Sequence, residues 1–171
     1  MRRYVLSVLV QNTSGVLAKV SGLFSRRGYN IRSLSVGETH DPKVSRITIE
    51  MVGDESVLEQ IQKQLEKQVY VITIKGLRSA SSVYKELILV KVKANAKRRA
   101  SIIELCDIFR TKIVDVSKDT IIIELTGSPE KNNALLDLLD EYGIIEMART
   151  GITALERGSG SLHQEDPQGS M

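Results

Sequence analysis

The feature that most limits the fold of this 171-residue chain is one order of strands and helices that occurs in each half. In the first half, β-branched residues at 4–10 predict a strand, and a polar turn at 11–15 follows it. Apolar residues at helical spacing over 16–24 then predict a helix that stops at Gly28. The rest of this half predicts strands at 31–36, 47–51 and 69–74, with a second helix, capped by Asp54, between the last two.

The second half repeats this order. Strands are predicted at 86–92, 112–116, 120–125 and 143–148, and residues 150–155 are a candidate extension of the sheet. One helix, at 97–109, follows the first of these strands. A second begins with Ser128 as N-cap and Pro129 at its first position. In the helix at 97–109, the residues predicted to face inward are Ala100, Ile103, Cys106 and Phe109.

The order βαββαβ is that of the ferredoxin-like supersecondary motif. We therefore predict an α+β protein of two tandem ferredoxin-like modules, at residues 1–77 and 84–157, joined by a linker at 78–83. Residues 158–171 are rich in Gly, Ser and Gln, and we predict a disordered tail there. Two helices cover one face of each sheet, so the other face needs a partner or water.

Composition disfavours several classes of protein. The net charge is +3 with basic and acidic residues interleaved, and aromatics make up 4%, which disfavours nucleic-acid binding. A single cysteine excludes an intramolecular disulfide and a cysteine-based zinc site. No apolar run approaches the ~20 residues of a membrane span, and the N-terminus does not resemble a signal peptide. We expect a cytoplasmic protein that binds neither nucleic acid nor membrane.

No catalytic centre is predicted. His40 falls in a loop and His163 in the tail, and neither lies near a plausible nucleophile in the sequence. A nucleophile elbow, a Walker loop and a dinucleotide fingerprint are all absent from the sequence. Cys106 is best explained as a small buried hydrophobic residue. We therefore predict no catalytic residue, no metal site and no cofactor in this chain.

The turn before the first helix carries the chemistry of a candidate ligand site. The start of a helix leaves backbone N–H groups of Gly15, Val16 and Leu17 unpaired, and the helix dipole favours an anion there. Gly15 has no Cβ, and Asn12 can both donate and accept hydrogen bonds. These groups suit the zwitterionic end of an amino acid. The same residues are also ordinary helix caps, and on the residues alone that alternative stays open.

Six segments of the chain resemble ACT domains and, more closely, the small regulatory subunits of acetolactate synthase (acetohydroxyacid synthase). The first half carries M-R-R-Y-V-L-S-V-L-V-Q-N-T-S-G-V-L, G-L-F-S-R-R-G-Y-N-I-R-S-L-S-V-G, S-R-I-T-I-E-M-V-G-D and L-E-Q-I-Q-K-Q-L-E-K. The second half carries F-R-T-K-I-V-D-V-S and A-R-T-G-I-T-A-L-E-R-G. The resemblance extends from Met1 to about Gly158.

This resemblance implies a non-catalytic subunit that binds valine or another branched-chain amino acid where two ACT domains pair, and so exerts feedback control. The residues that it assigns to the ligand are Asn12, Gly15, Val16 and Leu17 from one chain, with Asn30 and Ile31 from its partner. It also implies a large catalytic subunit, activated by this chain, that holds thiamine diphosphate, magnesium and FAD. That enzyme acts in the biosynthesis of valine, leucine and isoleucine.

The expected topology agrees with such pairing. The second strand of the sheet would lie at an edge, where unpaired backbone groups invite a strand from another copy. Pairing residues 31–36 with their copy would form a homodimer with one eight-stranded sheet about a two-fold axis. Asn30 would then reach the Gly15 loop of the other chain. Asn30 as a turn residue, and Val16, Leu17 and Ile31 as core residues, are alternatives that stay open.

Two other functions stay open. One is a stand-alone amino-acid-sensing ACT protein that regulates a different enzyme. The other is an enzyme of ferredoxin-like fold, such as an acylphosphatase, in which Arg2, Arg3 or Arg46 would hold phosphate beside an asparagine.

Overall fold

The first compact unit of the chain is a four-stranded sheet with two helices. The computed structural model describes residues 2–162, and residues 2–83 and 154–162 form this first unit, while 84–153 form a second. The elements of the first unit are β1 (Arg2–Gln11), α1 (Val16–Arg26), β2 (Ile31–Glu38), β3 (Val44–Gly53), α2 (Glu55–Glu66) and β4 (Val71–Leu77). Its strand order is β2-β3-β1-β4 and all neighbours are antiparallel, so β2 lies at an edge as predicted.

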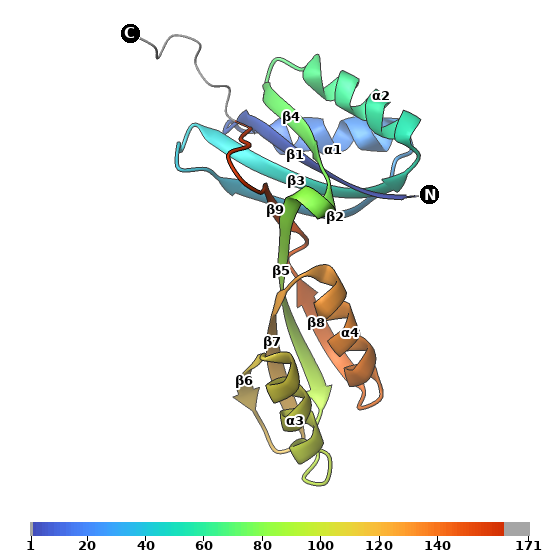
Figure 1. The fold of residues 1–171 in the computed structure, drawn as a ribbon, viewed down its shortest axis with the longest axis vertical. Helices are drawn as coiled ribbons and strands as arrows, with labels where there is room; N and C mark the ends of the chain where they lie inside the picture. The colour runs from blue at the N-terminus through green and yellow to red at the C-terminus, as the bar shows by residue number, and fades with distance from the viewer. Residues whose placement is uncertain (1, 163–171) are drawn as a thin grey trace. The chain divides into compact units, whose positions relative to one another are not determined.

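The core of this unit lies between the sheet and its two helices. Figure 1 shows α1 and α2 on the same side of the sheet. Alternate residues of β1 and β3 point to that side, because side chains alternate along a strand. The buried residues there include Leu6, Val8 and Val10 of β1, Ile47, Ile49 and Met51 of β3, and Val20, Phe24, Ile61 and Leu65 of the helices.

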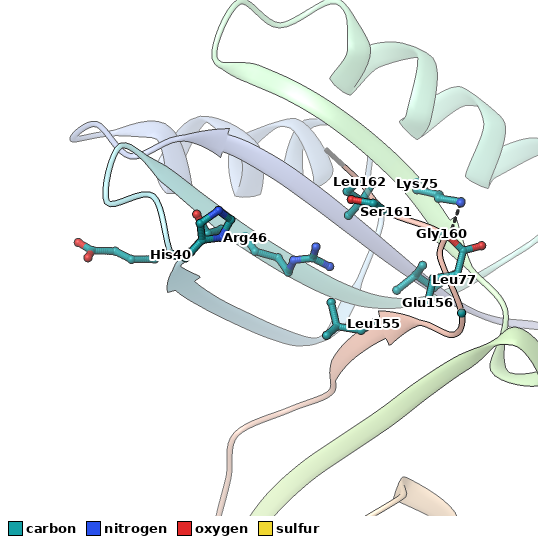
Figure 2. Close-up of a pocket in the computed structure, with 12 residues that line it drawn as sticks. His40, Arg46, Lys75, Leu77, Leu155, Glu156, Gly160, Ser161 and Leu162 are labelled. Atoms are coloured by element: carbon teal, nitrogen blue, oxygen red, sulfur yellow. Dashed lines mark hydrogen bonds and ion pairs between the residues drawn. The ribbon is translucent and has the colours of Figure 1, made fainter. Parts of the chain in front are cut away.

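The opposite face of this sheet is also buried, although no helix covers it. Val5, Ser7 and Leu9 of β1 point to that face and are at most 4% exposed. Residues 154–162, which include all but the first residue of a short strand, β9 (Thr153–Glu156), belong to the same unit. Polar contacts tie this C-terminal segment to the unit: Arg46 Nη1 donates to the Ala154 carbonyl at 3.4 Å, Lys75 pairs with Glu156 at 2.5 Å, and the Arg157 N–H donates to the Ser81 carbonyl at 2.8 Å. Figure 2 shows the segment running beside the sheet.

The position of this segment differs from the sequence-based boundaries. Residues 154–157 group with the first unit rather than with the module predicted at 84–157. In the predicted tail, residues 158–162 are described and Leu162 is 7% exposed, whereas residues 163–171 lie outside the described range. The physical reason is that the sheet offers an apolar face to Ala154 and Leu162. A composition-based prediction of disorder does not include that tertiary contact.

The second unit repeats the βαββαβ order. It contains β5 (Ser82–Lys93), which starts at the boundary, α3 (Arg99–Phe109), β6 (Lys112–Val116), β7 (Thr120–Gly127), α4 (Pro129–Asp140) and β8 (Ile144–Arg149). Its sheet order is β6-β7-β5-β8, and β9 pairs with β5. The core is built from Ile88, Val90 and Val92 of β5, Ile121, Ile123 and Leu125 of β7, and Ile102, Cys106, Leu135 and Leu139 of the helices. The predicted fold of two ferredoxin-like modules is confirmed.

Helix α3 buries two of the four residues predicted to face inward, since Cys106 and Phe109 pack on the core but Ala100 and Ile103 do not. Ile102 and Cys106 are buried, but Ala100 faces solvent and Ile103 is 39% exposed. The helix also begins at Arg99 instead of residue 97, because the Asn95 side chain accepts from the Arg98 N–H at 3.1 Å and the chain turns there first. Helical spacing also joins the residues that do pack on the core, namely Ile102, Leu105, Cys106 and Phe109. Periodicity alone could not choose between these two neighbouring stripes.

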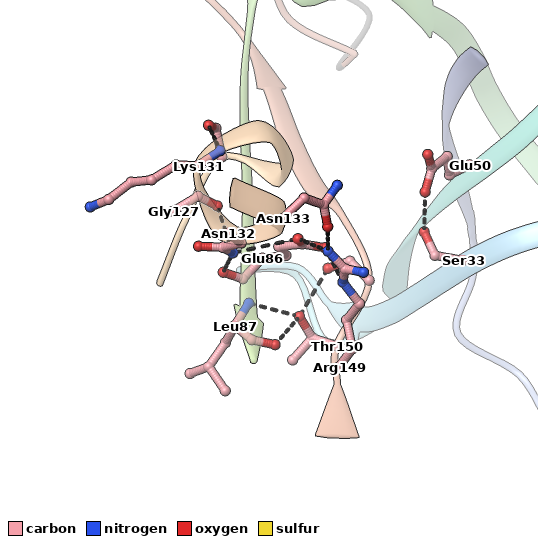
Figure 3. Close-up of polar contacts among 12 residues, drawn as sticks. Ser33, Glu50, Glu86, Leu87, Gly127, Lys131, Asn132, Asn133, Arg149 and Thr150 are labelled. Atoms are coloured by element: carbon pink, nitrogen blue, oxygen red, sulfur yellow. Dashed lines mark hydrogen bonds and ion pairs between the residues drawn. The ribbon is translucent and has the colours of Figure 1, made fainter. Parts of the chain in front are cut away.

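The A-R-T-G-I segment forms a buried ion pair at the end of β8. Arg149 donates from Nε to Glu86 Oε2 at 2.9 Å and from Nη2 to Glu86 Oε1 at 2.5 Å, in a bidentate arrangement (Figure 3). The same Nη2 contacts Asn133 Oδ1 at 2.7 Å, and Asn132 Nδ2 donates to Glu86 Oε1 at 3.4 Å. The Glu86 side chain is only 3% exposed. A carboxylate this buried depends on such partners, because its desolvation is otherwise unfavourable.

We predict that Ile102→Ala lowers the free energy of unfolding by about 2–5 kcal/mol, because it leaves a cavity in a packed core. The matched control is Ile103→Ala, one position along the same helix, which should change it by only about 0.5 kcal/mol. Urea denaturation followed by circular dichroism measures both values. Equal losses in the two variants would contradict the helix orientation.

We also predict that Arg149→Met lowers the free energy of unfolding by about 3 kcal/mol, because it leaves the buried Glu86 carboxylate without its cation. Adding Glu86→Gln to that variant should recover part of the loss, because the uncompensated charge is then gone. The two substitutions should be clearly non-additive in a double-mutant cycle of denaturation experiments. Additive effects would show that the pair is not coupled.

Candidate ligand-binding site

The loop between β1 and α1 is held open at Gly15. The Asn12 N–H donates to the Lys43 carbonyl at 2.8 Å, which anchors the loop beside the start of β3. Gly15 precedes the helix with φ +83°, a left-handed conformation that favours glycine, and a Cβ built there would meet nothing within 4 Å. Among residues 2–162, the N–H groups of Gly15 and Leu17 have no hydrogen-bond partner, and that of Val16 reaches Thr13 only at 3.4 Å. These donors lie beside the open space at Gly15.

The Asn12 side chain has a more specific role than the sequence indicated. Its Nδ2 donates to Glu38 Oε1 at 3.0 Å and to the Pro42 carbonyl at 2.9 Å. Both amide hydrogens are therefore used, whereas the side-chain oxygen has no partner in the described part of the chain. Asn12 is consequently arranged to accept from an ammonium group. It could donate to a carboxylate only by giving up an existing bond.

Glu38 is a residue that the sequence-based prediction missed. It ends β2 and lies 26 positions from Asn12 in the chain, but its carboxylate contacts the Asn12 amide. An acidic side chain here adds negative charge at the place where an ammonium would sit. No local motif points to Glu38, so only the pairing of β2 with β3 could have revealed it.

The other loop residues divide between core and surface. Val16 is 5% exposed and its side chain packs in the core, so only its backbone can face a ligand. Leu17 is 43% exposed and offers an apolar side chain beside the loop. Ile31 is partly buried against the core, and Asn30 is exposed.

The six predicted site residues do not come together within one chain. At one end of the sheet, Gln11 pairs with Val44 and Glu38 with Ser45. At the other end, Ile31 pairs with Met51. Asn30 and Ile31 are therefore separated from the Gly15 loop by the eight residues of β2, about 25 Å at ~3.3 Å per residue. One chain holds two partial clusters at opposite ends of an edge strand.

The described residues do not assemble an alternative reactive centre. Among residues 2–162 there is no group of three or more His, Cys, Asp or Glu side chains that could hold a metal ion. Cys106 is buried as predicted. Burial raises the pKa of its thiol, a hydrogen bond with Thr111 lowers that pKa by less, and the charge of Asp107 adds the smallest effect, a further rise. Within the same residues, no helix is long and apolar enough to cross a membrane.

Comparison with known proteins gives consistent matches over both parts of the chain. Residues 6–73 match the model of the AHAS small subunit-like ACT domain, and residues 85–158 match that of the small subunit of acetolactate synthase. The probable acetolactate synthase small subunit of Archaeoglobus fulgidus is 49% identical over 157 residues, which cover 92% of this chain and 98% of that protein. The small subunit of Mycolicibacterium smegmatis is 51% identical over 155 residues, which cover 91% of each.

A solved structure agrees with these sequence matches. The acetolactate synthase small subunit from Thermotoga maritima superposes with a TM-score of 0.86 at 41% sequence identity, covering 94% of this chain and 100% of that one. Family models that together match most of the chain and relatives near 50% identity at almost full length confirm the resemblance found in the sequence. The chain belongs to the acetolactate synthase small-subunit family, with the family's ACT domain at residues 6–73.

Proposed function

We propose that this chain is the regulatory subunit of an acetolactate synthase, and that it binds valine or another branched-chain amino acid between two ACT domains. The observation that carries the proposal is the division of the predicted site between two ends of an edge strand. Each end offers part of the recognition chemistry, and β2 has a free edge in the described chain. A second copy would supply the missing part.

Pairing of two β2 strands explains how the parts would meet. In an antiparallel pair related by a two-fold axis, the start of one strand lies beside the end of the other. Asn30 and Ile31 of one protomer would then lie near Glu38 of its partner. Glu38 already contacts Asn12, which is in the loop that leads to Gly15. The dimer would therefore hold two equivalent sites, each with residues from both chains.

The groups at such a site match an apolar amino acid in charge and in polarity. The carboxylate would accept from the free N–H groups at Gly15 and Leu17, where the helix dipole adds about 0.3–1 kcal/mol. The ammonium would donate to the Asn12 side-chain oxygen, with the Glu38 carboxylate nearby. Leu17 and Ile31 would contact the aliphatic side chain of the ligand, which favours a branched-chain amino acid over a polar one.

Regulation would follow from linkage between this site and the assembly with a large catalytic subunit. A ligand that binds one arrangement of the two ACT domains better than another shifts their equilibrium toward it. Typical coupling of about 1–3 kcal/mol changes an equilibrium about 5–150-fold. In this proposal thiamine diphosphate, magnesium and FAD belong to the large subunit, which this chain activates. No chemical step of the condensation is assigned to the small subunit.

We predict that Gly15→Asp abolishes valine binding, because it places a negative charge where the ligand carboxylate would sit. The fold should persist, since the space beside Gly15 is open and aspartate adopts the left-handed conformation more readily than most residues. Isothermal titration calorimetry with valine measures the binding. In assays with the large subunit, the variant should still activate the enzyme but should no longer respond to valine.

The matched control is Gly15→Asn, which has the same shape without the charge and tolerates the left-handed conformation. It should bind valine more weakly than the natural chain but measurably better than Gly15→Asp. Normal valine binding by Gly15→Asp would exclude this loop as the site. Failure of the natural chain to bind or respond to any branched-chain amino acid would exclude the effector class.

We also predict that Val36→Lys raises the dissociation constant of the homodimer at least about tenfold. Val36 lies on the edge strand and is 46% exposed, so a lysine would place like charges near the two-fold axis. Sedimentation equilibrium measures the dissociation constant of the dimer, which should rise. The affinity for valine should fall as the dimer weakens. Val69→Lys is the control, since Val69 is 92% exposed and lies outside β2. Equal dimer strength in the two variants would place the interface elsewhere.

A further inference from the structure

A cavity of the first unit lies on the sheet face opposite the helices. Its volume is about 500 Å³, within the common range of ligand pockets. It is bordered by Arg46 of β3, by Lys75 and Leu77 of β4, by the turn that follows β2, and by the C-terminal segment. Figure 2 shows the Arg46 side chain extending along the sheet toward the part of that segment that carries Leu155. None of the six predicted effector residues lines this cavity, although Glu38, which contacts Asn12, borders it.

Arg46 is the chemically distinctive group of this cavity. Its Nη1 donates to the Ser7 hydroxyl at 3.0 Å and to the Ala154 carbonyl at 3.4 Å, which are both neutral acceptors. Among the described residues it has no acidic partner, and its Nε and Nη2 make no hydrogen bond. Burial lowers the pKa of Arg46, so the surroundings disfavour the charge that the guanidinium nevertheless keeps. An anion would compensate that cost.

The other cation of the cavity is already paired. Lys75 Nζ lies 2.5 Å from Glu156 Oε2, so these two charges largely cancel each other. The apolar part of the lining comes from Leu77, Leu155 and Leu162. Glu38 also lines the cavity, but its carboxylate accepts from the Asn12 amide and forms no ion pair with Arg46 among the described residues. A guanidinium without an acidic partner, beside three leucines, calls for a ligand with one carboxylate and a short aliphatic chain. Nε and Nη2 of an arginine can bind both oxygens of one carboxylate.

We propose that this cavity is a second ligand site, which binds a short aliphatic carboxylate through Arg46. The proposal does not depend on the effector site at Gly15. Two sources share the required chemistry, namely a simple or 2-oxo carboxylic acid and an amino acid. Isovalerate and valine have the same branched skeleton and differ only in the ammonium group, so they separate the two sources.

The test is isothermal titration calorimetry of the full chain with isovalerate. The natural chain and Gly15→Asp should bind it equally, which distinguishes this cavity from the effector site. Arg46→Met should weaken binding at least tenfold, and Arg46→Lys should weaken it less because it keeps the charge but loses the bidentate geometry. Arg27→Met is the matched control: it removes an exposed arginine at the end of α1 and should leave binding unchanged.

A further variant keeps the test decisive if Arg46→Met does not fold. Leu155 is 59% exposed, so Leu155→Asp should fold normally while its carboxylate repels the ligand. It should also weaken isovalerate binding at least tenfold. If the Gly15→Asp variant binds valine as strongly as it binds isovalerate, the ligand of this cavity is an amino acid. If the variant binds valine much more weakly than isovalerate, the ligand is a simple or 2-oxo acid. Absence of isovalerate binding by the natural chain, unchanged binding by both Arg46→Met and Leu155→Asp, or tighter binding of inorganic phosphate would overturn the proposal.

Discussion

Burial of both faces of one central strand is the constraint on which the first unit depends. Along β1, Leu6 and Val8 point toward the helices, and Ser7 and Leu9 point the other way, and all four are at most 1% exposed. A strand that is buried on both sides needs two covering layers. Two helices cover one face of the sheet. The chain returns to the unit at Ala154 and contributes to the cover of the other face.

Packing of the C-terminal segment on the sheet face opposite the helices also changes the chemistry of that face. The guanidinium of Arg46 points to the face that the C-terminal segment shares, and it becomes partly desolvated without an acidic partner among the described residues. The Lys75–Glu156 pair fixes the segment beside it. The same packing that stabilises the unit therefore also creates the cavity that we propose as a second ligand site. Stability and ligand chemistry depend here on the same few contacts.

The edge strand β2 shows the opposite situation. Its backbone N–H and C=O groups on one side have no partner strand in the described chain. Asn30 directly precedes this strand and Glu38 is its last residue, so the two lie at opposite ends of the sheet. The small-subunit family to which the chain belongs, and the free edge, both support a two-chain site. The proposed effector site thus depends on symmetry, since the groups for the charged end of the ligand lie near Gly15, whereas Asn30 and the apolar contact of Ile31 would come from the other chain.

Several features of the fold and site could be predicted from local sequence, because short-range physics determines them. The strands of both units follow from β-branched runs, Ser128 and Pro129 open α4 as predicted, and Gly15 directly precedes α1. Local patterns failed where two options had similar spacing. In α3 the side of the helix that carries Ile102 is buried instead of the side that carries Ile103, because the direction of the sheet relative to the helix decides which side is buried.

The sequence by itself determined the βαββαβ order, the membership in a family and the residues of the candidate ligand loop, since each depends on neighbours in the chain. Only the tertiary structure decided that Glu38 contacts Asn12, that Arg149 pairs with the buried Glu86, and that residues 154–162 pack with the first unit. The pairs among these contacts join residues that are 26 and 63 positions apart. Their formation depends on strand register and on which apolar face is left to cover, and neither is encoded in a local pattern.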